Sequence, residues 1–190
     1  MYAWGNQGWS ALSEFLDEVA VAARSERGPI LECGSGLTTL ILAAIAERSG
    51  AEVWSLEDDP EWFLRIQSVL QEFGLTVSLR RVPLRSYGEF DWYDVEGLEL
   101  PVFSLVVCDG PAGETRGGRY GLLPVLQERL AGGCMVLVDD AARPSERTML
   151  ERWKSEGFVR YEVRGAEKPY GVAIIRAGAG ATNSGGEPAG

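Results

Sequence analysis

The sequence predicts an α/β fold with a mostly parallel seven-stranded sheet and helices on both of its faces. Short apolar runs alternate along the chain with longer stretches that have helical periodicity. The first five apolar runs are followed by Gly, Pro or acidic residues, which are typical of strand ends. The last two runs are separated by only a short turn. They therefore predict an antiparallel hairpin after five β-α units whose crossovers require parallel strands.

Seven strands account for the apolar runs. The run over residues 102–108 is nearly all apolar, as a central parallel strand buried on both faces should be. A turn over residues 165–169 joins the last two strands. The predicted strands cover residues 29–33, 53–56, 76–81, 102–108, 135–138, 158–163 and 170–176.

Five helices are predicted from periodicity and from their start and stop residues. Ser10 is the expected N-cap of the first helix, and Asp59 followed by Pro60 predicts the start of the third. Glycines end the last four of these helices, and residues 82–101 are expected to be irregular with room for a short helix. The predicted helices cover residues 10–25, 37–49, 60–73, 120–130 and 144–156, with expected stops at Gly50, Gly74, Gly132-Gly133 and Gly157.

The length of 190 residues suits one well-packed domain. We expect this domain to span residues 1–176. Residues 177–190 are mostly Gly and Ala without periodicity and predict a disordered tail.

The charge balance limits the partners that this chain can have. There are 18 basic and 28 acidic residues, and the net charge of −10 disfavours nucleic acids and anionic membranes. No apolar run approaches the roughly 18 residues that would span a bilayer. The first six residues lack the basic and apolar regions of a signal peptide, so a cytoplasmic location is expected. The sequence leaves open whether chains associate as a homo-oligomer.

Histidine is absent, which excludes Ser-His-Asp and Cys-His catalysis and His-ligated metals. A general base must then be a carboxylate, a tyrosine, a cysteine, one of the two lysines (Lys154 and Lys168) or a metal-bound group. The cysteines, Cys33, Cys108 and Cys134, predict reduced thiols in the core, with a catalytic thiol as the alternative.

A glycine turn at the end of the first strand indicates a ligand site. Gly34 and Gly36 allow a sharp turn and a close approach to the backbone, and the following helix points its positive end at the same place. Glu57 lies 21 residues after Gly36, at the end of the next strand, where a carboxylate can hold a ribose diol. Together they predict a pocket for an adenosine-bearing cofactor.

The acid-x-Gly-x-Gly pattern of Glu32, Gly34 and Gly36 resembles the first motif of class I S-adenosylmethionine (SAM) methyltransferases. The resemblance runs from about Ser10 to Arg176 and implies the strand order 3-2-1-4-5-7-6. It implies that the glycine turn lines the methionine half of SAM, with Thr38 or Thr39 on its carboxylate. Glu57 would hold the ribose. The cofactor residues implied in this way are Glu32, Gly34, Ser35, Gly36, Thr38, Thr39, Glu57, Asp58 (near the adenine) and Asp109.

Acidic residues also follow the fourth and fifth strands. Asp109, Asp139 and Asp140 should converge at the carboxyl edge of the sheet, and their repulsion requires a divalent cation, an arginine or a shared proton. The spacing resembles metal-dependent O-methyltransferases of the catechol type, which implies that these three acids ligate Mg²⁺ or a similar ion. Asp140 replaces the Asn of that pattern, and Gly110-Pro111-Ala112 replaces its lysine.

The Asp-Gly-Pro sequence instead resembles a bacterial group of methyltransferases assigned to small molecules or sugars. In that group an Arg-Pro-x-Glu-Arg run follows the strand-five acids, as residues 143–147 do here. The alternative to a metal is therefore that Arg143 or Arg147 neutralises the acids and Asp140 caps the next turn.

These resemblances imply SAM-dependent methyl transfer to an oxygen of a small polar molecule. With a metal, the ion would activate the acceptor hydroxyl; without one, Asp109 or Asp139 would be the catalytic base. Arg116, Arg119, Tyr120 and Arg143 are the expected acceptor-binding residues.

Several aromatic residues have alternative roles. Trp4 and Trp9 are expected either to cover the pocket or to anchor the sheet edge, and Trp92-Tyr93 to shelter the adenine or to complete the core.

Two other functions remain open at this point. An NAD(P)-binding oxidoreductase is disfavoured because Thr39 stands at the third glycine position and no tyrosine has a lysine four residues later. A non-catalytic protein that binds SAM or a partner is the other alternative.

Overall fold

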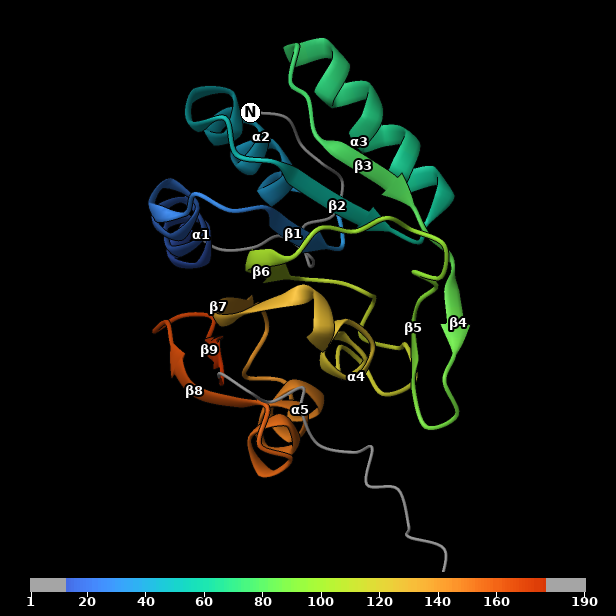
Figure 1. The fold of residues 1–190 in the computed structure, drawn as a ribbon, viewed down its shortest axis with the longest axis vertical. Coiled ribbons are helices and arrows are strands. Elements are labelled where there is room, and N and C mark those ends of the chain that lie inside the picture. The colour runs from blue at the N-terminus through green and yellow to red at the C-terminus, as the bar shows by residue number, and fades with distance from the viewer. Residues whose placement is uncertain (1–12, 177–190) are drawn as a thin grey trace, which may run out of the picture.

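A seven-stranded sheet forms the centre of the molecule, and the predicted strand order is confirmed (Figure 1). The computed structural model describes residues 13–176. The first five strands across the sheet pair with one another in parallel. The sixth strand across the sheet is antiparallel to the fifth and to the seventh. In order across the sheet, the strands are β3 (Ser78–Arg81), β2 (Val53–Glu57), β1 (Ile30–Cys33), β6 (Phe103–Cys108), β7 (Leu130–Val138), β9 (Tyr170–Ile175) and β8 (Val159–Arg164).

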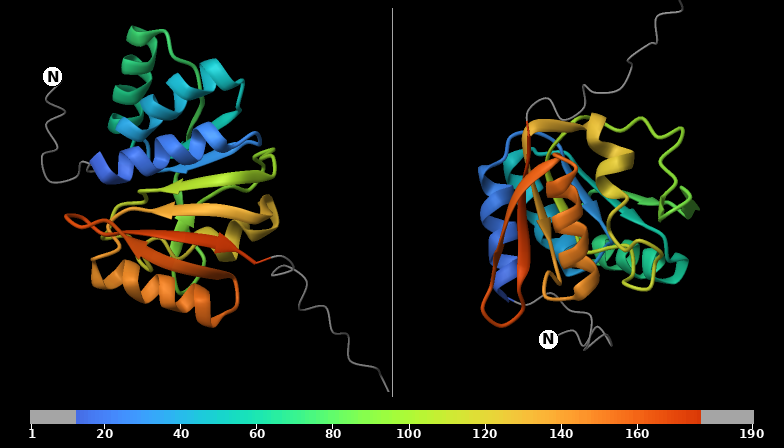
Figure 2. Two further views of the ribbon diagram at one scale, coloured as in Figure 1. Left: turned by 90° about the vertical axis from the view of Figure 1, so that its left-hand side faces the viewer. Right: turned by 90° about the horizontal axis from the view of Figure 1, so that it is seen from below.

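Helices cover both faces of this sheet, as the views in Figures 1 and 2 show. On one side lie α1 (Ser13–Ser25), α2 (Leu37–Ser49) and α3 (Pro60–Phe73). On the other lie α4 (Leu122–Leu126), the 3₁₀ turn η1 (Gln127–Arg129) and α5 (Pro144–Ser155). Successive residues of β6 alternate between the two cores: Leu105 and Val107 pack with α1 and α2, and Val106 packs on the α4 and α5 side.

Sequence signals at the helix ends are confirmed. The Asp59 carboxylate caps α3 by accepting a hydrogen bond from the Trp62 N–H at 2.7 Å, and Pro60 is the first helical residue. Gly50 and Gly74 follow α2 and α3 with φ of 72° and 66°, a region that glycine occupies without the strain other residues would have.

The prediction of an irregular stretch with a short helix between the third and fourth strands is wrong. This stretch contains a two-stranded antiparallel sheet, β4 (Leu84–Ser86) and β5 (Asp91–Tyr93). Its strands are only three residues long, too short to give a readable alternation. Burial of Trp92 and Tyr93 against the large core holds this hairpin in place.

The expected helix over residues 120–130 is also wrong in extent. Pro124 is tolerated in the first turn of α4, but the helix ends after five residues and passes into η1. Strand β7 then begins at Leu130, which pairs with Phe103. Gly132-Gly133 therefore does not stop a helix but lies within the strand, where the pairing with β6 shifts register and Gly133 has φ of 85°.

Some predictions concern residues outside the described range. They are the Ser10 cap, the roles of Trp4 and Trp9, and the tail over residues 177–190. Within residues 13–176, no helix is both long and apolar enough to cross a membrane.

Candidate functional site

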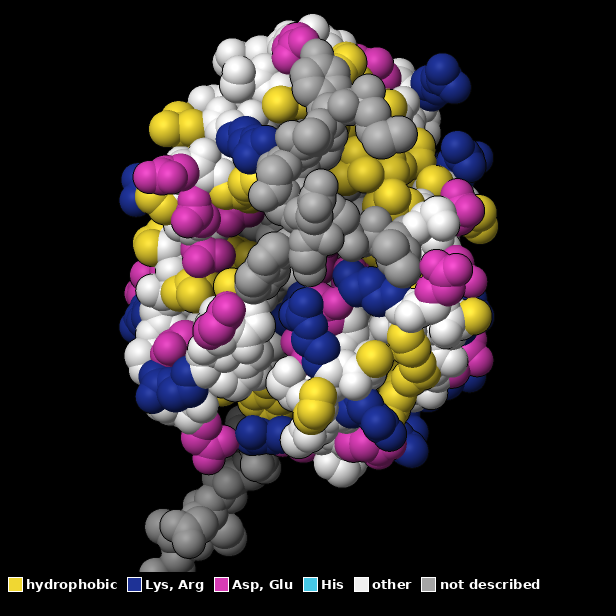
Figure 3. Space-filling model, turned by 180° about the vertical axis from the view of Figure 1, so that it is seen from behind, with side chains coloured by type: hydrophobic (Ala, Val, Ile, Leu, Met, Phe, Trp, Pro, Cys, Tyr) yellow, Lys and Arg dark blue, Asp and Glu magenta, His cyan; other side chains and the backbone are white. Residues whose placement is uncertain are grey.

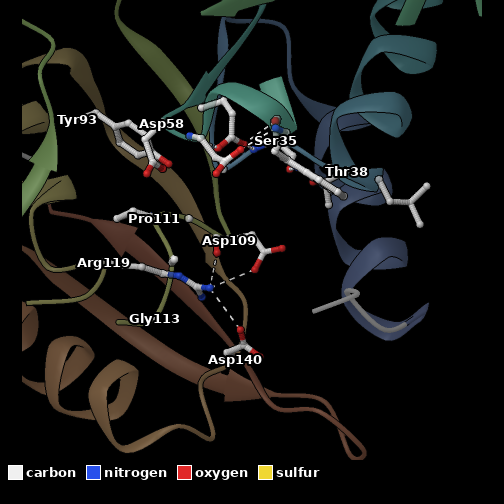
Figure 4. A pocket seen from close by; sticks show the side chains of 17 residues that line it. Ser35, Thr38, Asp58, Tyr93, Asp109, Pro111, Gly113, Arg119 and Asp140 are labelled. Atoms are coloured by element: carbon white, nitrogen blue, oxygen red, sulfur yellow. Dashed lines mark hydrogen bonds and ion pairs between the residues drawn. The ribbon is translucent and has the colours of Figure 1, made fainter. Parts of the chain in front are cut away.

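A cavity of about 420 Å³ lies beyond the carboxyl ends of β1, β2 and β6 (Figure 4). This volume is within the range of small-ligand sites. Three loops line it: the glycine turn over residues 34–38, the acidic stretch over residues 57–59 and residues 109–113 after β6. Asp58 and Tyr93 lie toward one end, and Arg119 and Asp140 lie toward the other.

The two glycines of the turn have different reasons to be glycine. Gly34 has φ of 83°, and a Cβ there would lie 2.5 Å from the Gly110 nitrogen, because the loops after β1 and β6 cross at this point. Gly36 has an extended backbone, with φ of 177°, and a Cβ there would meet nothing within 4 Å. Gly34 is thus required by the fold, whereas Gly36 leaves the space in front of α2 open.

A matched pair of variants tests this difference. Gly34→Ala is expected to lower the free energy of unfolding by about 2–4 kcal/mol, because it adds positive-φ strain and a backbone clash. Gly36→Ala should change it by less than about 1 kcal/mol. Urea unfolding of the two variants measures both values. Equal losses would contradict the roles assigned to the two positions.

Glu57 forms one wall of the cavity and is fixed in place by backbone donors. One carboxylate oxygen accepts hydrogen bonds from the Ser35 N–H at 2.9 Å and the Ser35 hydroxyl at 2.6 Å. The other accepts from the Asp59 N–H at 3.0 Å and has no second hydrogen bond from the described part of the chain, so it can accept another. Burial raises the pKa of Glu57 and also that of Asp58. The wall can accept hydrogen bonds from a ligand hydroxyl.

Glu32 lies beneath the cavity and is not part of its lining. Its carboxylate accepts hydrogen bonds from the hydroxyls of Thr38 at 2.5 Å, Thr39 at 2.7 Å and Ser55. Burial raises the pKa of Glu32 to about 7, although these hydroxyls lower it. Glu32 therefore links β1, β2 and the start of α2. Of the two threonines, only Thr38 lines the cavity.

Two aromatic residues complete the lining. Tyr93 is fully buried, and its hydroxyl has no hydrogen-bond partner among residues 13–176. Burial raises its pKa well above the usual value, so the hydroxyl is a neutral donor. Trp62, which the sequence analysis missed, donates from its indole N–H to the Ser35 carbonyl at 2.7 Å. The sequence signal that could have placed Trp62 at the cavity was its position in the first turn of α3, directly after the acidic stretch.

Three carboxylates converge at the other end of the cavity, as predicted. Ligand oxygens of Asp109, Asp139 and Asp140 lie within 4.8 Å of one another. Arg119 lies between two of these residues, 3.1 Å from an Asp109 oxygen and 3.3 Å from an Asp140 oxygen. Its guanidinium also donates to the carbonyls of Asp109 and of Asp139, the latter at 2.6 Å. The side chain is 2% exposed, so Arg119 is part of the buried framework of the site.

Two further cations complete this ion cluster. Arg143 lies 3.0 Å from Asp140. The Lys168 ammonium lies 2.6 Å from an Asp139 oxygen and 3.0 Å from an Asp140 oxygen. Burial lowers the pKa of Lys168, but its hydrogen bonds and the charges of both acids outweigh burial and raise it. Asp139, Asp140, Arg119, Arg143, Lys168 and Asp109 are hereafter called the ion cluster.

This arrangement does not fit a resident divalent cation. Carboxylate oxygens that would bind the ion are engaged by side-chain cations, and the three acids are balanced by three positive charges. Arg143 is one of the two arginines predicted to neutralise the acids. Within the described part of the chain, Arg147 makes no ion pair with them.

Asp109 and Asp139 differ in access to the cavity. The Asp109 side chain is 27% exposed and lines the cavity. Burial raises its pKa to about 6, while Arg119 lowers it and Asp139 and Asp140 raise it. Asp139 is fully buried, with one oxygen bonded to the Asp140 N–H at 2.8 Å and the other to Lys168. Of these two aspartates, only Asp109 can therefore contact a ligand in the cavity.

Three of the four expected acceptor-binding residues, Arg116, Tyr120 and Arg143, lie outside the cavity lining. Arg116 bonds the Ser86 hydroxyl at 2.6 Å and pairs with Asp91. The Tyr120 hydroxyl donates to the Glu156 carboxylate at 2.9 Å, and the ring packs under the Arg152 guanidinium at 3.8 Å. Arg119 lines the cavity, but its guanidinium forms ion pairs with acids of the ion cluster. Arg143 contacts the cluster by its ion pair with Asp140.

The cysteines are free and buried, as predicted. Burial raises the pKa of the Cys33 thiol well above its usual value, and that of Cys134 to about 12. Such thiols carry little thiolate at neutral pH and are poor nucleophiles.

Comparisons with known proteins find similarity in structure alone. No family model and no curated protein matches the sequence. A proposed caffeoyl-CoA O-methyltransferase from Staphylococcus aureus has a TM-score of 0.72 at 13% identity, covering 92% of this chain and 88% of its own. The O-methyltransferase TomG from Streptomyces achromogenes, in complex with SAM, has a TM-score of 0.69 at 15% identity. The match covers 89% of this chain and 82% of TomG. An O-methyltransferase from Bacillus cereus, in complex with S-adenosylhomocysteine (SAH), has a TM-score of 0.69 at 14% identity. The match covers 89% of this chain and 84% of that enzyme. The chain therefore has the Rossmann-like fold of class I methyltransferases, as predicted.

Proposed function

We propose that this protein is a SAM-dependent methyltransferase that acts on an oxygen of a small polar molecule. The observation that carries the proposal is the cavity itself, which joins an open glycine turn and a fixed carboxylate to an accessible aspartate. Two proteins with the same fold, TomG and the Bacillus cereus enzyme, were solved with SAM and SAH. Their similarity to this chain supports the proposal at the level of the fold.

The residues at one end of the cavity fit the adenosine and methionine halves of SAM. The open space beside Gly36 and the free N–H groups at the start of α2 suit a ligand carboxylate, with Thr38 beside them. Glu57 can accept a hydrogen bond from a ribose hydroxyl. The Tyr93 hydroxyl has no hydrogen-bond partner among residues 13–176, and it offers a buried donor that a bound nucleoside would satisfy. SAM supplies an electrophilic methyl group when bound.

At the other end, Asp109 is the general base of the proposal. An aspartate with a pKa of about 6 is ionised at neutral pH and can take the proton from an acceptor hydroxyl. Arg119 holds the Asp109 side chain and backbone carbonyl in place. Most of the rate enhancement is expected from positioning, which contributes up to roughly 7–11 kcal/mol in favourable systems.

A small acceptor is proposed because of the cavity volume and the surface. The cavity of about 420 Å³ leaves little room beyond a nucleoside and a compact second molecule. On the face in Figure 3, Lys and Arg side chains are interspersed with Asp and Glu, without the single basic patch that nucleic acids require.

Calorimetric titration with SAH and with NADH tests the cofactor. We expect SAH to bind and NADH not to bind; binding of NADH alone would favour the oxidoreductase alternative. Glu57→Ala should weaken SAH by about 1.5–3 kcal/mol, because a charge-assisted hydrogen bond is lost. The matched control is Glu61→Ala, an exposed acid of α3. Unchanged SAH affinity in Glu57→Ala, with normal affinity in the control, would remove Glu57 from the site.

The acceptor is sought with a panel of small hydroxylated compounds in an assay that measures SAH release. Binding of SAH without turnover of any compound in a broad panel would favour the non-catalytic alternative.

A further inference from the structure

The ammonium group of Lys168 lies between two buried carboxylates of the ion cluster. Its distances of 2.6 Å to Asp139 and 3.0 Å to Asp140 are those of direct ion pairs. Both acids are buried, and the Lys168 side chain is only 22% exposed. A cation that bridged Asp139 and Asp140 would have to occupy this same space.

The fold holds Lys168 at this position from a distant part of the chain. Lys168 lies in the turn between β8 and β9, and the antiparallel pairing of Val138 with Gly171 brings that turn next to the end of β7. The end of β8 and the turn are each attached to α1. Arg164 pairs with Glu18 at 2.8 Å, and the Ala166 N–H donates to the Glu14 carboxylate at 2.9 Å. Lys168 is thus placed by its backbone as well as by its charge.

The other cations make entry of a divalent ion still less favourable. Arg119 and Arg143 both contact Asp140. The cluster is neutral with three acids and three cations, so a divalent ion would bring two unbalanced charges close to fixed positive groups. A divalent ion can therefore bind here only if one of the side-chain cations is displaced.

We propose that Lys168 is a built-in counterion that takes the place of a divalent cation in this site. The acceptor oxygen then meets Asp109 beside side-chain cations, with no metal ion between them; this part rests on the proposed function. Occupation of the Asp139–Asp140 position by the ammonium does not rest on it. Removing the ammonium should therefore create a metal site that the natural protein lacks.

Titration with Mn²⁺, followed by the electron paramagnetic resonance signal of the free ion, tests this proposal. Lys168→Met should gain one Mn²⁺ site that is at least about tenfold tighter than any binding by the natural protein. Lys154→Met is the matched control, because Lys154 is the only other lysine and pairs with Glu151 on the surface. It should bind Mn²⁺ as the natural protein does. Adding Asp139→Asn to Lys168→Met should remove the gained site.

Two outcomes would overturn the proposal. One is a stoichiometric Mn²⁺ site in the natural protein at micromolar concentrations; the other is no gain in a folded Lys168→Met variant. Lys168→Gln, which keeps a polar group, replaces it if circular dichroism shows that Lys168→Met is unfolded. SAH titration of the same samples separates this result from the proposed function, because SAH binding can succeed or fail independently of Mn²⁺.

Discussion

Asp109→Asn is expected to slow methyl transfer by about 10²–10⁴-fold, the usual contribution of a positioned general base. Asp109 lines the cavity and is the most exposed carboxylate of the ion cluster, and an amide cannot take the acceptor proton. Asp139 cannot replace it, because both of its oxygens are bonded and it does not line the cavity. The turnover number is measured by SAH release with an acceptor from the panel. The affinity for SAH, measured separately, should change little.

The pH profile gives this prediction a second measurement. A general base works in its ionised form, and the pKa of Asp109 is raised to about 6 by burial. The ratio kcat/KM, which reports the pKa values of the enzyme without substrate, should therefore fall as the pH drops through about 6 and level off above about 7. Asp109→Asn should lack this step. Asp91→Asn, an acid that pairs with Arg116 outside the cavity, is the control and should keep it. A profile and rate unchanged in Asp109→Asn would assign the base to another group.

Arg119→Met is expected to lower the free energy of unfolding by about 3–5 kcal/mol, the typical cost of removing one partner of a buried ion pair. The guanidinium is 2% exposed and holds Asp109, Asp140 and two backbone carbonyls. Methionine also has a long side chain, but it lacks the positive charge that balances the buried carboxylate of Asp140. Urea unfolding measures the loss.

The control for Arg119 lies three residues earlier in the sequence. Arg116 also pairs with an aspartate, but both side chains are partly exposed to solvent. Arg116→Met should therefore cost less than about 1 kcal/mol. Similar losses in the two variants would mean that Arg119 contributes no more than a surface ion pair.

The parts of the fold that the sequence predicted are those with local signals. Gly50, Gly74 and Asp59-Pro60 mark helix ends by backbone chemistry that acts within a few residues. The strand order followed from the alternation of strands and helices together with the resemblance. Convergence of Asp109, Asp139 and Asp140 followed from parallel strands sharing one carboxyl edge.

The parts that failed depend on contacts between distant residues. Tyr120 was expected at the cavity, but the sequence does not show that Glu156, 36 residues later, accepts its hydroxyl. Strand β7 begins at Leu130 because of its pairing with Phe103, which no local pattern reveals.

Lys168 could have been placed from topology. In the predicted strand order, the turn before the last strand lies at the carboxyl end of the fifth, where Asp139 and Asp140 are. In the sequence this lysine was expected only as one of the possible bases, although the predicted hairpin was enough to locate it.

The position of β9 has a consequence for the order in which the protein assembles during translation. β9 pairs between β7 and β8 although it is the last described strand, so β7 has an unpaired edge until residues 170–175 have been synthesised. Asp139 likewise lacks its ammonium partner until the ribosome has passed residue 168. Nascent chains that end before this hairpin would carry an open strand edge and an uncompensated acid, and chaperones that bind exposed strands should hold them longest at that stage.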